Sequence, residues 1–169
     1  RNGYDFKELL KYNKVFLNST TRFFPNNNPF DYLKPVPEIE DKVRSIANEF
    51  SPYTVGIHIR RGDNKKSTKN SPTQLFIDEM QEEYKQNSEV TFFLATDSIE
   101  VESMLKSTFG SRVFTHEKIL DRNKEQAIQD ALVDMLCLSR TNKIFGSYWS
   151  SFSGVAAEIG GINLETLKK

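Results

Sequence analysis

The sequence predicts an α/β fold in which a parallel sheet is covered by helices on both faces. Segments with the two-residue period of strands alternate about five times with segments of helical period, and the connections are short. Residues 90–95 are apolar almost throughout, which is typical of a strand buried on both faces of its sheet. In such sheets ligands bind beyond the carboxyl ends of the strands, so residues at those ends are the candidates for function.

The size and composition of the chain fit one globular domain. It has 169 residues, 37% of them hydrophobic, with 13 Phe, 6 Tyr and one Trp, which is enough for a core. The 23 basic and 23 acidic residues cancel, which argues against a non-specific nucleic-acid binder, because such binding needs a net basic face. No window approaches roughly 18 consecutive apolar residues, so no membrane span is expected. We expect one soluble domain over residues 1–169, with an entry segment at 1–52 and a core with the functional motifs at 53–160.

Cys137 is the only cysteine, so no internal disulfide can form. This favours a reducing compartment, such as the bacterial cytoplasm, over the Golgi lumen, where disulfides are usual. No cluster of His and Cys has the spacing of metal ligands, and neither the Gly-x-Gly-x-x-Gly nor the Walker pattern occurs. We therefore expect no metal site, no dinucleotide cofactor and no ATP hydrolysis.

The entry segment predicts one strand, one loop and one helix. The apolar run at residues 15–17 indicates a short strand. Four prolines and an Asn run between residues 20 and 37 indicate a loop with at most one helical turn. From Glu38 apolar residues recur at helical spacing as far as Phe50, and Ser51-Pro52 ends this amphipathic helix.

Residues 55–59 predict a strand in which 55, 57 and 59 face one side of the sheet and 56, 58 and 60 the other. A polar loop is expected over 60–71. A helix then opens near Pro72, with apolar residues at every fourth position from Phe76.

The strand at 90–95 is followed by Asp97-Ser98-Ile99-Glu100, which looks like a capping box. It opens a helix that Gly110 closes, and residues 113–114 form a short strand. The clearest helix runs from 125 to 140, and its apolar side is expected to comprise Ile128, Ala131, Leu132, Met135 and Leu136. A last strand at 143–146 and a last helix at 153–159 complete the pattern.

The first polar motif at a predicted strand end is His58-Ile59-Arg60-Arg61-Gly62-Asp63. Two consecutive arginines emerge where the strand gives way to loop, with no run of acids nearby. Guanidinium groups fit phosphate geometry, and a pyrophosphate leaving group needs its developing charge stabilised. Both arginines could instead pair with carboxylates elsewhere in the fold, and this alternative stays open. His58 alone is more often a satisfied buried histidine than a functional one.

Three further features lie near strand ends or on the best helix. Asp97 leaves a buried strand and enters a helix, which favours an ordinary N-cap, while Thr96 and Ser98 could face a ligand. Residues 147–154 place four serine hydroxyls at a helix start, where free N–H groups and the helix dipole favour an anion. Capping by one serine would explain only one of them. Asp134 interrupts an apolar helical stretch, which predicts a buried salt bridge or a ligand contact.

Together these motifs resemble the GDP-fucose-dependent fucosyltransferases of the α1,2, α1,6 and O-fucosyl group. Residues 55–63 are similar to the first motif of that family and 93–98 to its second. Asp134, 138–139 and 150–153 are similar to its third region. The order and approximate spacing agree, and the resemblance covers about residues 53–160.

The resemblance implies a role for each matching residue. His58 would lie at the guanosine side, and Arg60 on the β-phosphate as the catalytic residue. Asp134 would read the N–H edge of guanine, and Ser150 and Ser151 would donate to the phosphates. The implied GDP-fucose site comprises His58, Arg60, Arg61, Asp63, Asp97, Asp134, Ser150 and Ser151. Within it, Arg61 would support phosphate charge or hold the loop, Asp63 would steady the motif, and Asp97 could be structural.

The implied fold is Rossmann-like, the donor-binding half of a two-domain GT-B glycosyltransferase. The implied reaction moves fucose from GDP-fucose to a glycan acceptor hydroxyl, with inversion and without a metal or other cofactor. The acceptor domain would precede this part of the protein, and turnover by the chain alone is left open. Two alternatives are a non-catalytic nucleotide- or phosphate-binding module of the same fold, and an adhesion protein that displays Arg61-Gly62-Asp63.

Overall fold

The sheet of this protein has five parallel strands in the order β3-β2-β1-β4-β5. The computed structural model describes residues 6–16, 30, 32–121 and 123–169. The strands are β1 (Thr54–Ile59), β2 (Thr91–Thr96), β3 (Val113–Phe114), β4 (Lys143–Ser147) and β5 (Asn163–Leu167). The helices are α1 (Pro37–Ala47), α2 (Lys65–Asn70), α3 (Thr73–Gln86), α4 (Ile99–Phe109), α5 (Glu125–Leu138) and α6 (Ser151–Gly160). Two 3-10 helices, η1 (Phe6–Lys11) and η2 (Gly110–Arg112), complete the described elements.

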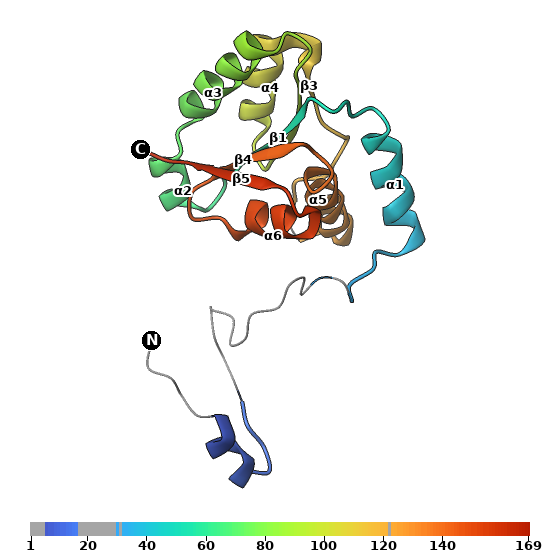
Figure 1. Ribbon diagram of the computed structural model, residues 1–169, viewed down its shortest axis with the longest axis vertical. Helices are drawn as coiled ribbons and strands as arrows, with labels where there is room; N and C mark the ends of the chain where they lie inside the picture. The colour runs from blue at the N-terminus through green and yellow to red at the C-terminus, as the bar shows by residue number, and fades with distance from the viewer. Residues whose placement is uncertain (1–5, 17–29, 31, 122) are drawn as a thin grey trace.

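Helices cover both faces of the sheet, as the alternating pattern predicts. Helices α3 and α4 lie on one side and α5 and α6 on the other, with α1 beside α5 (Figure 1). The two faces of β1 separate as expected: Val55, Ile57 and Ile59 belong to the core under α3 and α4. Gly56 faces α5, and His58 stacks on a side chain of α6.

Strand β2, an interior strand of the sheet, is buried on both faces, which confirms the prediction from its apolar run. Phe92 and Leu94 join the α3–α4 core, while Phe93 and Ala95 join the core under α1, α5 and α6. Full burial of a Phe or Leu side chain, as at Phe92, Phe93 and Leu94, stabilises the fold by about 1.5–3 kcal/mol relative to leaving it exposed. Pairing of Ile59 with Thr96 ends β1 and β2 at the same level, so the residues that follow them are neighbours.

The structure corrects the predicted boundaries in three places. Val15 and Phe16 are not in a strand, and Phe16 is 90% exposed; Leu17 and most of the expected loop lie outside the described residues. The loop expected at 60–71 contains α2, because the Asn64 side chain caps it by accepting from Ser67 N at 3.0 Å. A further strand, β5, follows the expected last helix, and its edge position leaves it mostly exposed and without an apolar run.

The buried face of α5 differs from the predicted one. Ile128 is 65% exposed, and Ala131 and Leu132 are exposed as well. The buried residues are Ala127, Asp130, Val133, Asp134, Cys137 and Leu138. A prediction from hydrophobic periodicity assigns acidic residues to the solvent side of a helix. Because Asp130 and Asp134 lie on the buried side of α5, the predicted apolar face was displaced from the observed one.

We expect Gly160→Ala to destabilise the fold by about 1–3 kcal/mol, because a methyl group there overpacks a rigid contact. A Cβ on Gly160 would overlap the carbonyl of Ser139, with Ser139 Cα only 3.2 Å away, and backbone cannot yield as a side chain can. Gly154→Ala is the matched control in the same helix, since a Cβ there meets nothing within 4 Å. The control should be neutral or more stable by up to about 1 kcal/mol in urea unfolding. Equal stability of the two variants would contradict this close contact between the end of α5 and α6.

Candidate functional site

A cavity of about 410 Å³ opens at the carboxyl ends of β1 and β2 and is closed by α5, α6 and the loop before α5. This volume lies within the usual range for small-molecule sites. Polar and apolar residues both line it: the strand ends, α5 and α6 contribute polar side chains, and apolar ones come mainly from α5, α6 and the loop before α5. The lining comprises His58, Arg60, Asn64, Ala95, Thr96, Asp97, Lys118, Ile119, Leu120, Ala127, Asp130, Ala131, Asp134, Met135, Trp149, Ser150, Ser151, Phe152 and Val155.

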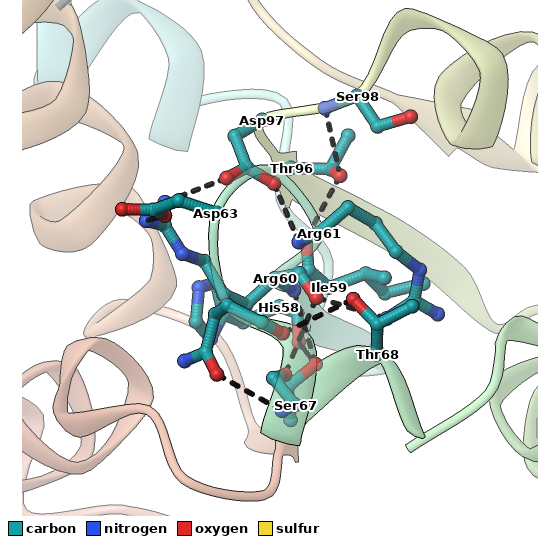
Figure 2. Close-up of polar contacts among 12 residues, drawn as sticks. His58, Ile59, Arg60, Arg61, Asp63, Ser67, Thr68, Thr96, Asp97 and Ser98 are labelled. Carbon is teal, nitrogen blue, oxygen red and sulfur yellow. Dashed lines mark hydrogen bonds and ion pairs between the residues drawn. The ribbon is translucent and has the colours of Figure 1, made fainter. Parts of the chain in front are cut away.

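Arg60 reaches this cavity while its guanidinium is held between two carboxylates. Its Nη1 lies 2.6 Å from Asp97 Oδ2, and its Nη2 lies 2.6 Å from Asp63 Oδ1 (Figure 2). Of the two alternatives that the sequence left open, pairing with carboxylates is found for Arg60. The two acids differ: Asp97 is 21% exposed, whereas Asp63 is 72% exposed and faces solvent.

Asp97 is not the N-cap of α4, contrary to the prediction. Ser98 occupies that position, and its Oγ accepts from Val101 N and donates to Glu100. The Asp97 carboxylate instead crosses to the end of β1, where it binds the Arg60 guanidinium and accepts from Arg61 N at 2.7 Å. A short-range pattern cannot distinguish these two roles, because the partner lies 36 residues earlier in the sequence.

Arg61 points away from the cavity. Its Nη2 donates to Thr73 Oγ1 at 2.7 Å and its Nη1 to the carbonyl of Arg60 at 2.9 Å, so it ties the loop to the start of α3. Burial lowers the pKa of this guanidinium, although the charge of Asp97 opposes the shift. Arg61 does not line the cavity, which favours loop-holding over phosphate contact. In the Arg61-Gly62-Asp63 triplet, both charged side chains make contacts within the fold, although Gly62 and Asp63 are exposed.

The start of α6 forms another wall of the cavity. Ser150 is its N-cap residue but makes no side-chain capping hydrogen bond, and Ser151 follows as the first helical residue. The preceding Trp149 has a φ of 59°, and its carbonyl accepts from Asn64 Nδ2 at 2.9 Å. Ser150 and Ser151 line the cavity that Arg60 also lines, so the first turn of α6, whose N–H groups have no partner within the helix, forms part of its wall.

The other two hydroxyls of the serine-rich segment are buried and structural. Ser147 accepts from Arg60 N at 3.0 Å and donates to the carbonyl of His58, which ties β4 to the end of β1. Ser153 is buried against Gly146 of β4. Only Ser150 and Ser151 are therefore placed to meet a ligand.

A buried cluster of ionisable groups lines the cavity on α5 and in the loop before it. Asp134 accepts from Lys118 Nζ at 2.7 Å, and the side chains are 8% and 6% exposed. This confirms the predicted buried salt bridge. His116 Nε2 lies 3.1 Å from the other oxygen of Asp134, but the two are not aligned as a hydrogen bond.

His58 is buried and stacks on Phe152, with ring centroids 4.8 Å apart. Burial lowers the pKa of His58 to about 4; Asp134 opposes this shift, while Arg60 and Lys118 add to it. The imidazole is therefore neutral at pH 7, and its Nδ1 has no hydrogen-bond partner among the described residues. A neutral ring with an unused nitrogen suits a nucleoside better than a phosphate.

Lys118, Asp130, Phe152 and Asn64 belong to the site but were not predicted for it. Asp130 lies four residues before Asp134 on the same face of α5, so the helical period could have found it. Its Oδ2 accepts from Ile119 N at 3.0 Å, which holds the loop before α5 against the helix. Lys118 had no sequence signal, because only the course of that loop brings it to Asp134.

The described residues contain no group of three or more His, Cys, Asp or Glu side chains that could hold a metal ion. Within the same part of the chain, no helix is both long and apolar enough to cross a bilayer.

Comparison with known proteins identifies structural relatives. No protein-family model matches the chain, and no curated protein matches it. The NodZ α1,6-fucosyltransferase soaked with GDP-fucose is 27% identical with a TM-score of 0.55, over 75% of this chain and 43% of NodZ. POFUT1 in complex with GDP is 12% identical with a TM-score of 0.55, over 78% and 46% of the two chains. A mutant of Arabidopsis thaliana FUT1 in complex with GDP is 16% identical with a TM-score of 0.53, over 78% and 33%.

These matches confirm the predicted resemblance to fucosyltransferases and the Rossmann-like α/β fold class. POFUT1 and FUT1, at 12% and 16% identity, are similar to this chain in fold alone, and NodZ shares 27% of the aligned residues as well. The chain spans less than half the length of each of these proteins.

The buried neutral His58 predicts a loss of stability in mild acid. The unfolded chain takes up a proton on this residue near pH 6.5, but the folded chain does so only near pH 4. The free energy of unfolding should therefore fall by up to about 3 kcal/mol as the pH drops across this interval. Urea unfolding of the parent and of His58→Gln between pH 7 and pH 4 measures the contribution as a difference. Parallel pH profiles of the two proteins would contradict it.

Proposed function

We propose, from this fucosyltransferase-like fold and the cavity at its strand ends, that the chain is the donor-binding domain of a glycosyltransferase. It binds GDP-fucose, and the complete enzyme transfers the fucose to a hydroxyl of a glycan acceptor. The similarity to NodZ, a fucosyltransferase whose crystals were soaked with GDP-fucose, supports the choice of donor.

The observation that carries the proposal is the joint position of two kinds of group in one cavity. Arg60 and the uncapped start of α6 offer positive charge and free N–H groups, which suit a diphosphate. Asp134 and neutral His58 line the same cavity together with apolar side chains of α5 and α6, which suit a purine nucleoside. A nucleoside diphosphate needs both environments at once.

The chemistry follows from the charge that develops on the leaving group. The acceptor hydroxyl attacks the fucose carbon from the side opposite GDP, so that the configuration inverts. The bond to the β-phosphate oxygen breaks, and its electron pair passes to GDP. Arg60 and the α6 N–H groups stabilise that charge, in the role that the resemblance assigns to them in place of a metal ion. The hydroxyl proton passes to a base that we do not assign to this chain.

The remaining predicted residues support this arrangement rather than touch the reacting atoms. Asp97 holds Arg60 and the backbone of Arg61, and Arg61 holds the loop. Asp63 lies on the Arg60 Nη2 that a phosphate oxygen would use, so the donor has to displace this exposed carboxylate. Ser150 and Ser151 donate to the phosphates, and Asp134 accepts from the guanine N–H edge.

The acceptor domain, which the resemblance places before this part, completes the enzyme. A nucleotide-binding module without transferase activity would use the same cavity. Incubation of the complete enzyme with GDP-fucose and a glycan acceptor, with measurement of released GDP, separates the two hypotheses. Calorimetry with GDP, GDP-fucose, GDP-mannose and UDP-sugars tests the donor itself. No GDP binding up to millimolar concentration would refute the proposed donor.

Arg60→Ala should weaken GDP binding by about 1.5–3 kcal/mol, because charged hydrogen bonds to the phosphate are lost. Isothermal titration calorimetry measures the change. Arg112→Ala is the matched control, since this guanidinium donates to the carbonyl of Ser88 before the start of β2, at the opposite end of the strands from the cavity. The control should bind GDP as the parent does. An unchanged dissociation constant in Arg60→Ala would remove Arg60 from the site.

A further inference from the structure

We propose that Lys118 recognises the 6-oxo group of the donor base and so makes the site specific for a 6-oxopurine. The inference rests on the proposed function and adds to it a specificity residue in the loop before α5. It starts from the buried pair of Lys118 and Asp134, which faces the cavity rather than a closed core.

The ammonium group of Lys118 keeps donors for a ligand. Its Nζ donates to Asp134 Oδ2 at 2.7 Å, and a lysine has three N–H donors and no acceptor. Its side chain is only 6% exposed, yet the residue lines the cavity. An ammonium withdrawn from water is costly unless its remaining donors find acceptors, so an acceptor is expected in the cavity beside Asp134.

Unmatched atoms around this pair also call for a ligand. Asp134 Oδ1, His58 Nδ1 and His116 Nε2 are buried and have no hydrogen-bond partner among the described residues. Buried polar atoms are nearly always paired in native proteins, and exceptions need an explanation. As a carboxylate oxygen, Asp134 Oδ1 is an acceptor, and it lies 3.1 Å from His116 Nε2 without an aligned hydrogen bond. The cavity therefore offers a donor on Lys118 next to an acceptor on Asp134.

The position of Lys118 does not depend on Asp134 alone. Asp130 Oδ2 accepts from the backbone N–H of Ile119 at 3.0 Å, and its Oδ1 accepts from Gln126 Nε2 at 2.9 Å. The residue after Lys118 is thus fixed to α5 by a separate hydrogen bond. Such pre-ordering reduces the cost of binding and is expected of a recognition residue.

Guanine matches this pair of groups on one edge. Its O6 is an acceptor, and the adjacent N1–H and 2-amino groups are donors, so O6 meets Lys118 while the N–H groups meet Asp134. Adenine reverses the first two groups, because it presents a 6-amino donor to the ammonium and an N1 acceptor to the carboxylate. Lys118 therefore rejects 6-aminopurines, and Asp134 selects bases with donors at positions 1 and 2.

The test compares GDP with the diphosphate of 2,6-diaminopurine riboside, which keeps the 2-amino group but carries an amine in place of O6 and, as in adenine, an acceptor at N1 in place of the N1–H. Calorimetry on the chain should show the parent binding GDP at least about tenfold more tightly. Lys118→Met removes the donors at similar length, and the ratio should fall by about threefold or more, while Asp134 still discriminates at N1. Lys118→Arg, which keeps charged donors, should retain the preference. Lys143→Met is the matched control, since Lys143 pairs with Glu83 at the start of β4, and its ratio should equal that of the parent.

The outcomes separate this inference from the proposed function. A parent that binds neither nucleotide refutes the proposed function itself. A parent that binds both equally, or a Lys118→Met variant that keeps the parent's ratio, overturns the role of Lys118 and leaves GDP binding intact. If Lys118→Met does not fold, the ratio measured on the parent and on Lys118→Arg still decides, because similar affinities for both nucleotides overturn the inference.

Discussion

The contact between Asp97 and the end of β1 is the interaction on which the site depends. Parallel pairing brings Ile59 and Thr96 side by side, so Arg60 and Asp97 leave the sheet as neighbours. One carboxylate then binds the Arg60 guanidinium with one oxygen and the Arg61 backbone N–H with the other. This bidentate contact turns Arg60 toward the cavity, while Thr73 draws the next guanidinium outward.

Ser147 at the end of β4 joins this strand to the end of β1. Its hydroxyl bonds both to Arg60 N and to the His58 carbonyl, which fixes β4 against β1 immediately before the turn into α6. The start of α6, with its free N–H groups, is thereby held in the cavity wall that Arg60 also lines. A hydroxyl that the sequence offers as a ligand donor thus serves to position the groups that bind.

Among the described residues, the buried carboxylates Asp130 and Asp134 are both paired with lysines, and both line the cavity. Arg60 has two carboxylates, and Asp134 has Lys118. Desolvation makes such pairs weak contributors to stability, and removing one partner is costly. These pairs lie at the cavity wall and not in the closed core of the fold. The neutral His58 between these charges adds no repulsion toward either, because burial keeps it unprotonated.

The sequence by itself determined the layers, the alternating faces of β1, the doubly buried β2 and the candidates at the strand ends, because these depend on local periodicity. It also identified Asp134 as a buried ion, since an acid in an apolar stretch needs a partner wherever the helix packs. The tertiary structure decided the buried face of α5, the role of Asp97, the direction of the Arg61 side chain away from the cavity and the position of Lys118 at the cavity beside Asp134. Each of these depends on a partner between 12 and 36 residues away or on the packing of a neighbouring helix. The chemistry of a site is therefore visible in residue types, but its geometry is set by contacts that only the folded sheet brings together.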